Sequence, residues 1–472
     1  MAKIVNKYPV GIQTFEEIRE KGYLYVDKTK YIVDFREKGM KYIFLSRPRR
    51  FGKSLFASTL QAYFEGRKEL FEGLAIAEYE KEWVKHPVLH FDMSGAKHFD
   101  ADGLNSYLNL QLLPYEKLYG KGEGEIYPNE RLDGIVKRAY EQTGEKAVVI
   151  IDEYDAPLLD VVHEKENLQP LRRIMQNFYS PLKKLDPYLE FTFITGITKF
   201  TQISLFSVLN NLSNISFDAP YATICGISKQ EAAENFIPEI EAMGEENGWT
   251  PEETLKQLTA FYDGYHFCRK NMVDIFNPFS LINALDDREL RNYWASSGAT
   301  SLLPKFVDDM EMKMEYFDHC FIERDTLETS DVVNGGAELF LYQSGYLTIK
   351  GYDDGVYILG FPNFEVRKAL YSVVVPALTM KSNSEVVSAQ SFLRKMMQDG
   401  NTAEAKKALK ALIADVPYSN KKMASMDMEE RYRLIMSTIF RALGFRVEVE
   451  RMLATGRIDM IVEVPSFTYV LE

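Results

Sequence analysis

Short apolar runs alternate with amphipathic stretches over about the first 220 residues of the chain. The runs are nearly continuous in apolar residues, which is typical of strands buried on both faces of a parallel sheet. We expect such strands at residues 41–45, 87–94, 147–152, 190–197 and 221–225. Between them, residues 54–65 place Phe56, Leu60 and Phe64 on one helical face. The alternation predicts an α/β domain with a parallel sheet and helices on both of its faces.

The pattern changes after Ser228. This residue opens a Ser-x-x-Glu capping box, and a mostly helical region follows to about residue 294. Residues 300–410 mix helical and strand-like patterns, with a strand at 356–360 and a helix at 402–413. The last fifty residues predict a helix at 429–443 followed by strands at 446–450, 457–464 and 467–472. We therefore expect an α/β core at 1–226, a helical lid at 227–300, a mixed, winged-helix-like connector at 301–415 and an α/β module at 416–472.

Composition places the chain among ordinary globular proteins. Its 472 residues are 46% hydrophobic and 26% charged. The net charge of −13 argues against a protein that coats nucleic acid, although it leaves room for a local basic groove. Three widely spaced cysteines suggest neither a disulfide framework nor a zinc site. There is no signal-peptide pattern and no apolar stretch long enough for a membrane helix, so we expect a cytoplasmic protein without a membrane partner.

The most specific chemical pattern follows the first predicted strand. Residues 47–54 read Arg-Pro-Arg-Arg-Phe-Gly-Lys-Ser and lead directly into the first helical pattern. Strand, loop and helix in this order are what a phosphate-binding loop requires. In such a loop Gly52 would let the backbone approach the phosphates, and Lys53 would reach the outer phosphates. Ser54 would ligate magnesium.

The match to the usual Gly-x-x-x-x-Gly-Lys-Ser/Thr pattern is incomplete, because Arg47 stands at the first glycine position. Arg49 and Arg50 either contact phosphate or face a partner. A basic surface turn is the alternative for the whole segment.

Two carboxylates end the apolar run at 147–152. Asp152 can hold the water shell of a magnesium ion, and Glu153 can polarise an attacking water. Asp155 is either a third carboxylate of this group or a cap for the turn before Pro157. On the strand at 190–197, Thr195 is the candidate that senses the outer phosphate, with Lys199 as the second choice.

Several motifs together resemble the bacterial AAA-ATPase-like family. They include Tyr-Val-Asp-Lys-Thr at 25–29, the Arg-Pro-Arg-Arg loop, Asp-Glu-Tyr-Asp-Ala-Pro at 152–157 and Tyr-Asp-Gly-Tyr at 262–265, and the resemblance covers nearly the whole chain. It implies ATP and Mg²⁺ as cofactors, and it implies that the segment at 25–29 lies near the adenine. The resemblance assigns the following residues to cofactor binding: Arg47, Arg49, Arg50, Phe51, Gly52, Lys53, Ser54 and Leu55.

The same family typically carries a C-terminal nuclease domain of the PD-(D/E)XK superfamily. Such a site needs an acid on a helix, an Asp on the second strand and Glu-x-Lys on the third. Glu429 or Glu430, Asp459 and Glu472 fit the acids, with Asp459 and Glu472 as metal ligands, but no lysine follows Glu472. We therefore expect either a fragment of a nuclease or a module that has lost this activity. Ordinary surface acids are the alternative.

Three functions remain open on the sequence. The first is an ATPase coupled to a nuclease module that acts on DNA. The second is a nucleotide-gated sensor or scaffold whose nuclease domain only binds DNA. The third is a P-loop phosphotransferase. A homo-oligomer is compatible with all three, since many ATPases of this type take an arginine from a neighbouring subunit.

Overall fold

The structure is a computed structural model of the chain. It describes residues 7–96, 100–162, 164–198, 212–270, 272–296, 319–329, 335–414, 428–453 and 456–471. The chain divides into two compact units. The first unit comprises Met1–Tyr293 and Phe321–Asn363, and the second comprises Trp294–Cys320 and Phe364–Glu472. The four-part division expected from the sequence stays a prediction.

A five-stranded parallel sheet forms the centre of the first unit, with the strand order β2-β3-β4-β1-β5. Its strands are β1 (Tyr42–Ser46), β2 (Val88–Asp92), β3 (Ala147–Asp152), β4 (Leu189–Gly196) and β5 (Ser213–Asn214). All six residues of β3 are buried, as the continuous apolar run predicts for a central strand. The expected parallel α/β sheet is confirmed.

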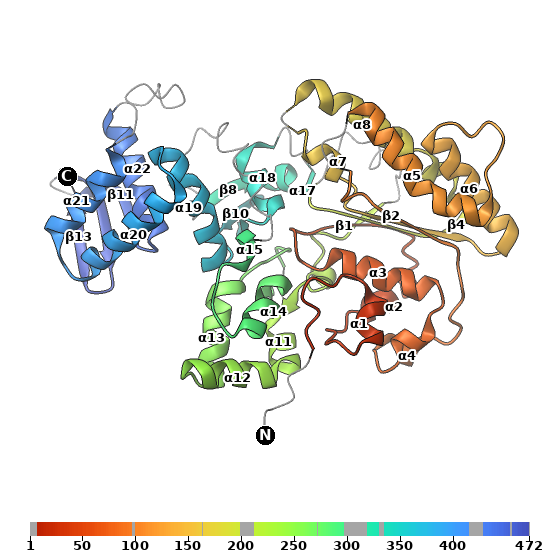
Figure 1. The fold of residues 1–472 in the computed structure, drawn as a ribbon, viewed down its shortest axis with the longest axis horizontal. Helices are drawn as coiled ribbons and strands as arrows, with labels where there is room; N and C mark the ends of the chain where they lie inside the picture. The colour runs from red at the N-terminus through yellow and green to blue at the C-terminus, as the bar shows by residue number, and fades with distance from the viewer. Residues whose placement is uncertain are drawn as a thin grey trace. The chain divides into compact units, whose positions relative to one another are not determined.

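Helices cover both faces of this sheet (Figure 1). One face carries α1 (Phe15–Glu20), α2 (Lys30–Glu37), α3 (Lys53–Phe64) and α4 (Ile76–Tyr79), with the short turn η1 (Lys68–Phe71). The other carries α5 (Ala101–Tyr119), α6 (Pro128–Thr143), α7 (Ala156–Leu159) and α8 (Lys165–Tyr179), followed along the chain by α9 (Pro181–Lys184) and η2 (Asp186–Tyr188). This layering shields both sides of the apolar strands from water.

The strand expected at 221–225 is wrong. The structure has the 3₁₀ turn η3 (Ala219–Tyr221) followed by further turns. Pro220 sits at the start of this turn, where its ring favours the bend and its missing N–H cannot serve a strand ladder. Most side chains of the segment, including Tyr221, Ile224 and Cys225, are buried, so its apolar character serves side-chain packing. The fifth strand is the two-residue β5, which pairs with β1.

The rest of the first unit contains a helical group and a small sheet. The helical group is β6 (Ile227–Ser228), α11 (Lys229–Asn235), α12 (Ile237–Asn247), α13 (Pro251–Tyr262), β7 (Ile275–Phe276), α14 (Pro278–Asp287) and the start of α15 (Tyr293–Ser296). The capping box of Ser228 and Glu231 is present, as predicted. The small sheet is β8 (Cys320–Glu323), β10 (Val356–Gly360) and β9 (Thr348–Asp353), with α17 (Arg324–Thr329) and α18 (Gly336–Ser344). The strand predicted at 356–360 is confirmed.

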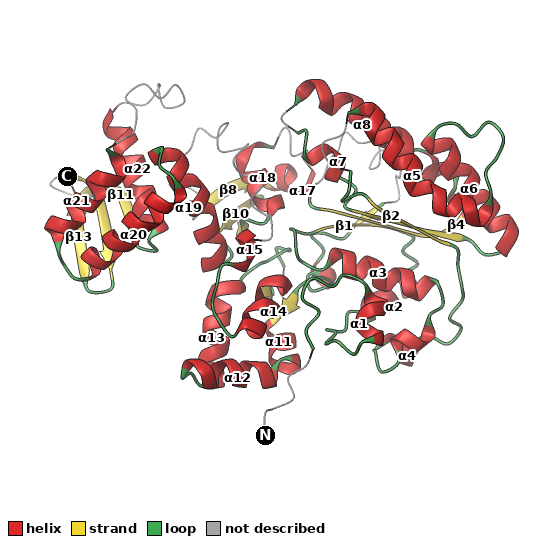
Figure 2. Cartoon of the chain, in the orientation of Figure 1, coloured by secondary structure: helices red, strands yellow, loops and turns green. Residues whose placement is uncertain are grey.

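The second unit combines helices with an antiparallel sheet (Figure 2). Its elements are α19 (Phe364–Thr379), α20 (Asn383–Gln398), α21 (Thr402–Ile413), α22 (Met428–Ala442), β11 (Arg446–Leu453), β12 (Gly456–Val464) and β13 (Phe467–Leu471). The sheet order is β11-β12-β13. Gly400 turns the chain between α20 and α21 with φ 74°, and Phe467 lies 2.7 Å from the place of a Cβ atom there. Both the conformation and the close approach require glycine at this position.

Candidate functional site

The loop between β1 and α3 has the geometry of an anion site. Gly52 precedes the helix in the left-handed conformation, with φ 90°, and no side chain caps the N-terminus of α3. The first N–H groups of a helix have no partner within the helix, and they carry the positive end of its dipole. A phosphate group fits this end of α3, whose twelve residues form a full-length helix.

Lys53 brings a positive charge into the centre of the loop. Its side chain is buried, and its ammonium donates to the backbone carbonyls of Arg47 at 3.0 Å and Pro48 at 3.1 Å. The loop therefore curves around the ammonium group. Ser54 follows on the first turn of α3 and is half-buried, so its hydroxyl oxygen is available at the same helix end.

Asp152 and Thr195 meet at the tips of neighbouring strands. The Thr195 hydroxyl donates a short hydrogen bond to the Asp152 carboxylate, and both side chains are buried. The order β3-β4-β1 places Thr195 between Asp152 and the phosphate-loop candidate. The loop is tied to the same strand, because the Arg47 N–H donates to the Gly196 carbonyl at 3.2 Å. Asp152, Thr195 and the loop after β1 therefore lie at the carboxyl edge of the sheet.

Glu153 has an unusual backbone and an altered acidity. Its φ of 51° lies in the left-handed region, which is uncommon for a residue with a side chain and is often found at functional sites. Burial raises the pKa of its carboxyl group, while the nearby Lys53 ammonium opposes this rise. The carboxylates of Asp152 and Asp155 raise the pKa of Glu153 further, and Arg49 lowers it. The ammonium of Lys53 and the acids at the end of β3 therefore act on one another at one edge of the sheet.

Asp155 holds the turn that follows β4. Its carboxylate accepts hydrogen bonds from the N–H groups of Ile197 at 3.0 Å and Thr198 at 2.6 Å, and from the Thr198 hydroxyl at 2.6 Å. The residue is fully buried, which raises the pKa of its carboxyl group. Asp155 therefore caps a turn. The capped turn follows β4, however, whereas the sequence suggested the turn before Pro157.

Arg47 contradicts the expectation of a phosphate contact. Its guanidinium is buried and donates to three backbone carbonyls, those of Ser46 and Ser216 at 2.9 Å and that of Tyr221 at 3.0 Å. It also lies over the Phe267 ring, 4.1 Å from the centroid. The Arg47 guanidinium therefore forms its hydrogen bonds with the protein backbone. Its planar arrangement of donors lets it satisfy several carbonyls at once.

Phe51 is an anchor of the loop as well. Its ring is buried and meets Tyr265 and Phe267 edge-on, with centroids 4.8 and 5.2 Å apart. Its carbonyl accepts a hydrogen bond from the Gly226 N–H at 3.0 Å. The side chain thus fixes the loop to the turn before β6 and to the segment after α13, and its ring does not face a phosphate position.

The other loop residues remain candidates for ligand contact. Arg49 is half-buried and lowers the pKa of Glu153, so its charge is felt at the carboxylates. Arg50 is exposed, with its guanidinium 5.0 Å from the centroid of the Phe279 ring. Leu55 lines a small, mostly apolar cavity of about 80 Å³ beside Gly52.

The wall of this cavity includes the segment that the resemblance associates with adenine. Tyr25, Val26 and Lys28 line it together with Gly52 and Leu55. The Lys28 ammonium is buried and donates to the Thr223 carbonyl at 2.8 Å and to the Glu231 carboxylate at 2.6 Å. Burial lowers the pKa of Lys28, and Glu231 opposes that shift. The bond to Glu231 ties this wall of the cavity to α11.

Mg²⁺ prefers oxygen ligands and needs only one or two carboxylates from the protein. The Asp152 carboxylate and the Ser54 hydroxyl are oxygen donors at the same edge of the sheet, so the residues fit such an ion. Lys199, the second choice for phosphate sensing, lies outside the described residues.

In the second unit, the carboxylates of Glu429 and Asp459 both lie near one arginine. The Arg457 guanidinium lies 3.5 Å from a carboxylate oxygen of each. Glu450 joins the same network, 3.2 Å from Arg457 and 2.9 Å from Arg433. Glu472 lies outside the described residues. Within the described parts of the chain, no group of three or more His, Cys, Asp or Glu side chains could hold a metal ion.

Among the described residues, no helix is both long enough and apolar enough to cross a lipid bilayer.

We predict that Arg47→Met lowers the free energy of unfolding by about 3 kcal/mol, because it leaves buried carbonyls without donors. The exposed Arg50→Met should change it by no more than about 0.5 kcal/mol. Urea unfolding of both variants measures the difference. If Arg47→Met unfolds like the unmodified chain but loses nucleotide affinity, Arg47 contacts the ligand after all.

Comparison with known proteins agrees with this arrangement. A family model described as a predicted AAA-ATPase matches residues 9–206, which include both the loop and the acids of β3. A protein of Azotobacter chroococcum mcd 1, described as an uncharacterized protein in the vnfD 5′ region, is 31% identical over 482 residues. The match covers 99% of this chain and 89% of that relative. The chain therefore belongs to the family of predicted AAA-ATPase-like proteins.

Proposed function

We propose that this protein binds ATP with Mg²⁺ at the edge formed by β1, β3 and β4, and that it hydrolyses the nucleotide. The observation that carries the proposal is the convergence of Lys53, Asp152 and Thr195, which come from three different segments of the first unit. A polyphosphate needs N–H donors and a cation on one side and a metal-holding acid on the other. These groups are the ones that meet here.

In this proposal the N-terminus of α3 and the Lys53 ammonium bind the phosphates. The ammonium exchanges the carbonyls of Arg47 and Pro48 for phosphate oxygens, which are stronger acceptors because they are charged. Ser54 and Asp152 hold the magnesium ion, which neutralises charge on the outer phosphates when bound. Thr195 fixes the orientation of the Asp152 carboxylate through its hydrogen bond.

Glu153 is the proposed general base. Its carboxylate lies beside Asp152, and burial raises its pKa, which makes it a better proton acceptor than an exposed glutamate. The Lys53 ammonium opposes this rise in pKa, because its positive charge stabilises the ionised carboxylate of Glu153. Glu153 therefore orients a water molecule and takes its proton as it attacks the outer phosphate.

We predict that Lys53→Ala weakens binding of a fluorescent ATP analogue by about 100-fold, because the variant loses charge-assisted hydrogen bonds to phosphate. Lys68→Ala is the matched control, since Lys68 is exposed in the turn after α3 and should leave the affinity unchanged. A fluorescence titration measures both. Unchanged affinity in Lys53→Ala would remove the loop from the proposal.

We predict that Asp152→Asn lowers magnesium-dependent ATP turnover by about 100-fold while it changes nucleotide affinity much less. Asp92→Asn serves as the control. Asp92 is the register partner of Asp152 on the neighbouring strand β2, but it is exposed. Phosphate release and analogue binding are measured on the same samples. Full turnover in Asp152→Asn would show that this acid does not hold the metal.

A second candidate function concerns the module at the end of the chain. We propose a nucleotide-gated scaffold whose C-terminal module binds DNA without cutting it. The expected order of one helix and three strands is present as α22, β11, β12 and β13. Arg457 contacts both Glu429 and Asp459, so a guanidinium stands where a metal-dependent nuclease would need its ion.

This second candidate predicts no nicking of supercoiled plasmid by the protein with Mg²⁺ and ATP, while DNA is retained in a filter-binding assay at low salt. Nicking that disappears in Asp459→Asn would contradict the scaffold and favour an ATPase coupled to an active nuclease.

A further inference from the structure

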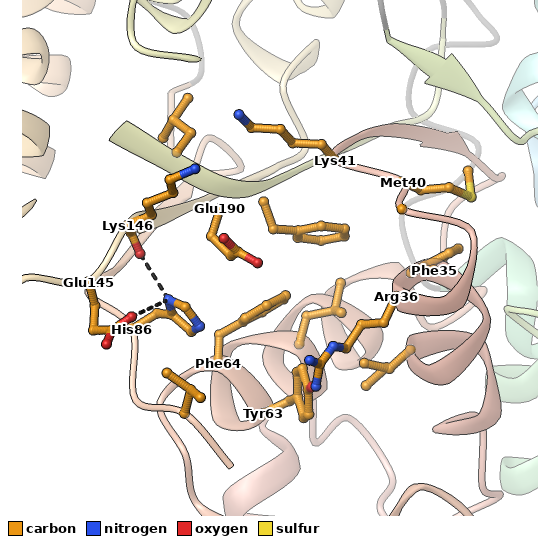
Figure 3. Close-up of a pocket in the computed structure, with 16 residues that line it drawn as sticks. Phe35, Arg36, Met40, Lys41, Tyr63, Phe64, His86, Glu145, Lys146 and Glu190 are labelled. Atoms are coloured by element: carbon orange, nitrogen blue, oxygen red, sulfur yellow. Dashed lines mark hydrogen bonds and ion pairs between the residues drawn. The ribbon is translucent and has the colours of Figure 1, made fainter. Parts of the chain in front are cut away.

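A second and larger cavity lies at the opposite edge of the sheet of the first unit (Figure 3). Its volume is about 550 Å³, which is in the usual range of small-molecule sites. Lys41 precedes β1, Lys146 precedes β3 and Glu190 is the second residue of β4, so the cavity opens at the amino ends of these strands. The proposed nucleotide site uses the carboxyl ends of the same strands. The two sites are therefore separate, and α3 runs between them from Lys53 to Phe64.

The floor of this cavity is aromatic. Phe64 stacks on Phe191 with ring centroids 5.0 Å apart and an angle of 29°, and Phe35 stacks on Phe191 at 6.2 Å. Tyr63 and Leu60 from α3 complete the floor, and all five side chains are buried. Such a surface takes an apolar or aromatic body, and the faces of its rings attract positive charge.

Two of the cations that line the cavity, Arg36 and Lys41, are already engaged. The Arg36 guanidinium forms an ion pair with Glu80 and donates to the Tyr63 hydroxyl at 2.6 Å. The Lys41 ammonium donates to the carbonyl and the carboxylate of Asp186 at 2.7 and 2.8 Å. Lys41 lowers the pKa of Asp186 most strongly, and Lys146 adds to this effect. An anionic ligand would have to compete with these acids for the same donors.

Hydrogen-bond acceptors, in contrast, face the interior of the cavity. Figure 3 shows the Glu190 carboxylate turned toward Phe64, while the side chains of Lys41 and Lys146 extend away from that ring. Burial raises the pKa of the Tyr63 hydroxyl to about 12, and the charge of Glu190 adds to this rise against the effect of Arg36. His86 Nδ1 lies 3.0 Å from the Lys146 carbonyl. A neutral imidazole in that contact carries its proton on Nδ1 and leaves Nε2 as an acceptor.

We propose that this cavity binds a small organic cation, an ammonium compound with an aromatic or aliphatic body. The body packs on Phe64 and its aromatic neighbours, and the ammonium group donates to the Glu190 carboxylate. A further donor on the ligand fits His86 Nε2. The combination of ring faces with the Glu190 carboxylate favours a cation over a neutral molecule of the same shape.

The test uses 2-phenylethylamine as the probe and 3-phenylpropionate, of similar size but opposite charge, as its control. Calorimetric titration of the full chain at neutral pH is expected to show saturable binding of one amine per chain and at least about tenfold weaker binding of the carboxylate. Equal affinity for both compounds, or no binding of the amine at millimolar concentration, would overturn the proposal.

Two variants locate the site. Glu190→Gln keeps the shape of the side chain and should weaken amine binding about tenfold, whereas Glu123→Gln, which changes an exposed acid outside the cavity, should not. Val84→Trp places a large ring at a partly exposed position of the wall and should block entry without a loss of stability. Thermal unfolding confirms that the variants fold. If both cavity variants bind the amine as the unmodified chain does, the cation binds elsewhere and the assignment is wrong.

Discussion

The position of β4 between β1 and β3 is the constraint on which the proposed active site depends. In a parallel sheet the carboxyl ends of neighbouring strands share one edge, so Thr195 stands beside both Asp152 and the loop after β1. The hydrogen bonds from the Thr195 hydroxyl and the Glu153 N–H then compensate the buried Asp152 carboxylate for its lost solvation. A site that has to hold a metal ion gains from this arrangement, because little reorganisation is needed when the ion binds.

Two kinds of residue share the phosphate loop. Arg47 and Phe51 face the protein, where they bond buried carbonyls and pack on Phe267, and they hold the two ends of the loop. Gly52 and Lys53 lie at the N-terminus of α3, where our proposal places the phosphates. A guanidinium at the first position gives rigidity through hydrogen bonds, where the usual pattern has a glycine with backbone freedom. The departure from the usual motif therefore changes how the loop is fixed to the protein. The Gly-Lys-Ser end of the motif, at residues 52–54, is unchanged.

Much of this organisation could be predicted from the sequence, because β3, α21 and the capping box at Ser228 have patterns that local physics determines. The failures have a common cause. The segment at 221–225 is apolar because its side chains pack and not because it pairs in the sheet, and only the tertiary structure distinguishes the two. Likewise, nothing in the residue type of Arg47 says whether its guanidinium meets phosphate or carbonyl oxygen. The cavity near Glu190 draws its walls from five separate segments, so no local motif marks it.

The ion pair of the buried Lys28 and the half-buried Glu231 gives the helical region a physical connection to the small cavity beside Gly52. Burying two charges costs more than an isolated pair usually returns, and such pairs persist where all donors and acceptors are satisfied. Here Lys28 also bonds the Thr223 carbonyl, and the second oxygen of Glu231 accepts from the N–H and hydroxyl of Ser228 at the start of α11. A ligand that moves Lys28 must therefore disturb the cap of α11. Because an unpaired buried charge is costly, the wall of the cavity and this helix have to move together, which is the coupling that a nucleotide-driven switch requires.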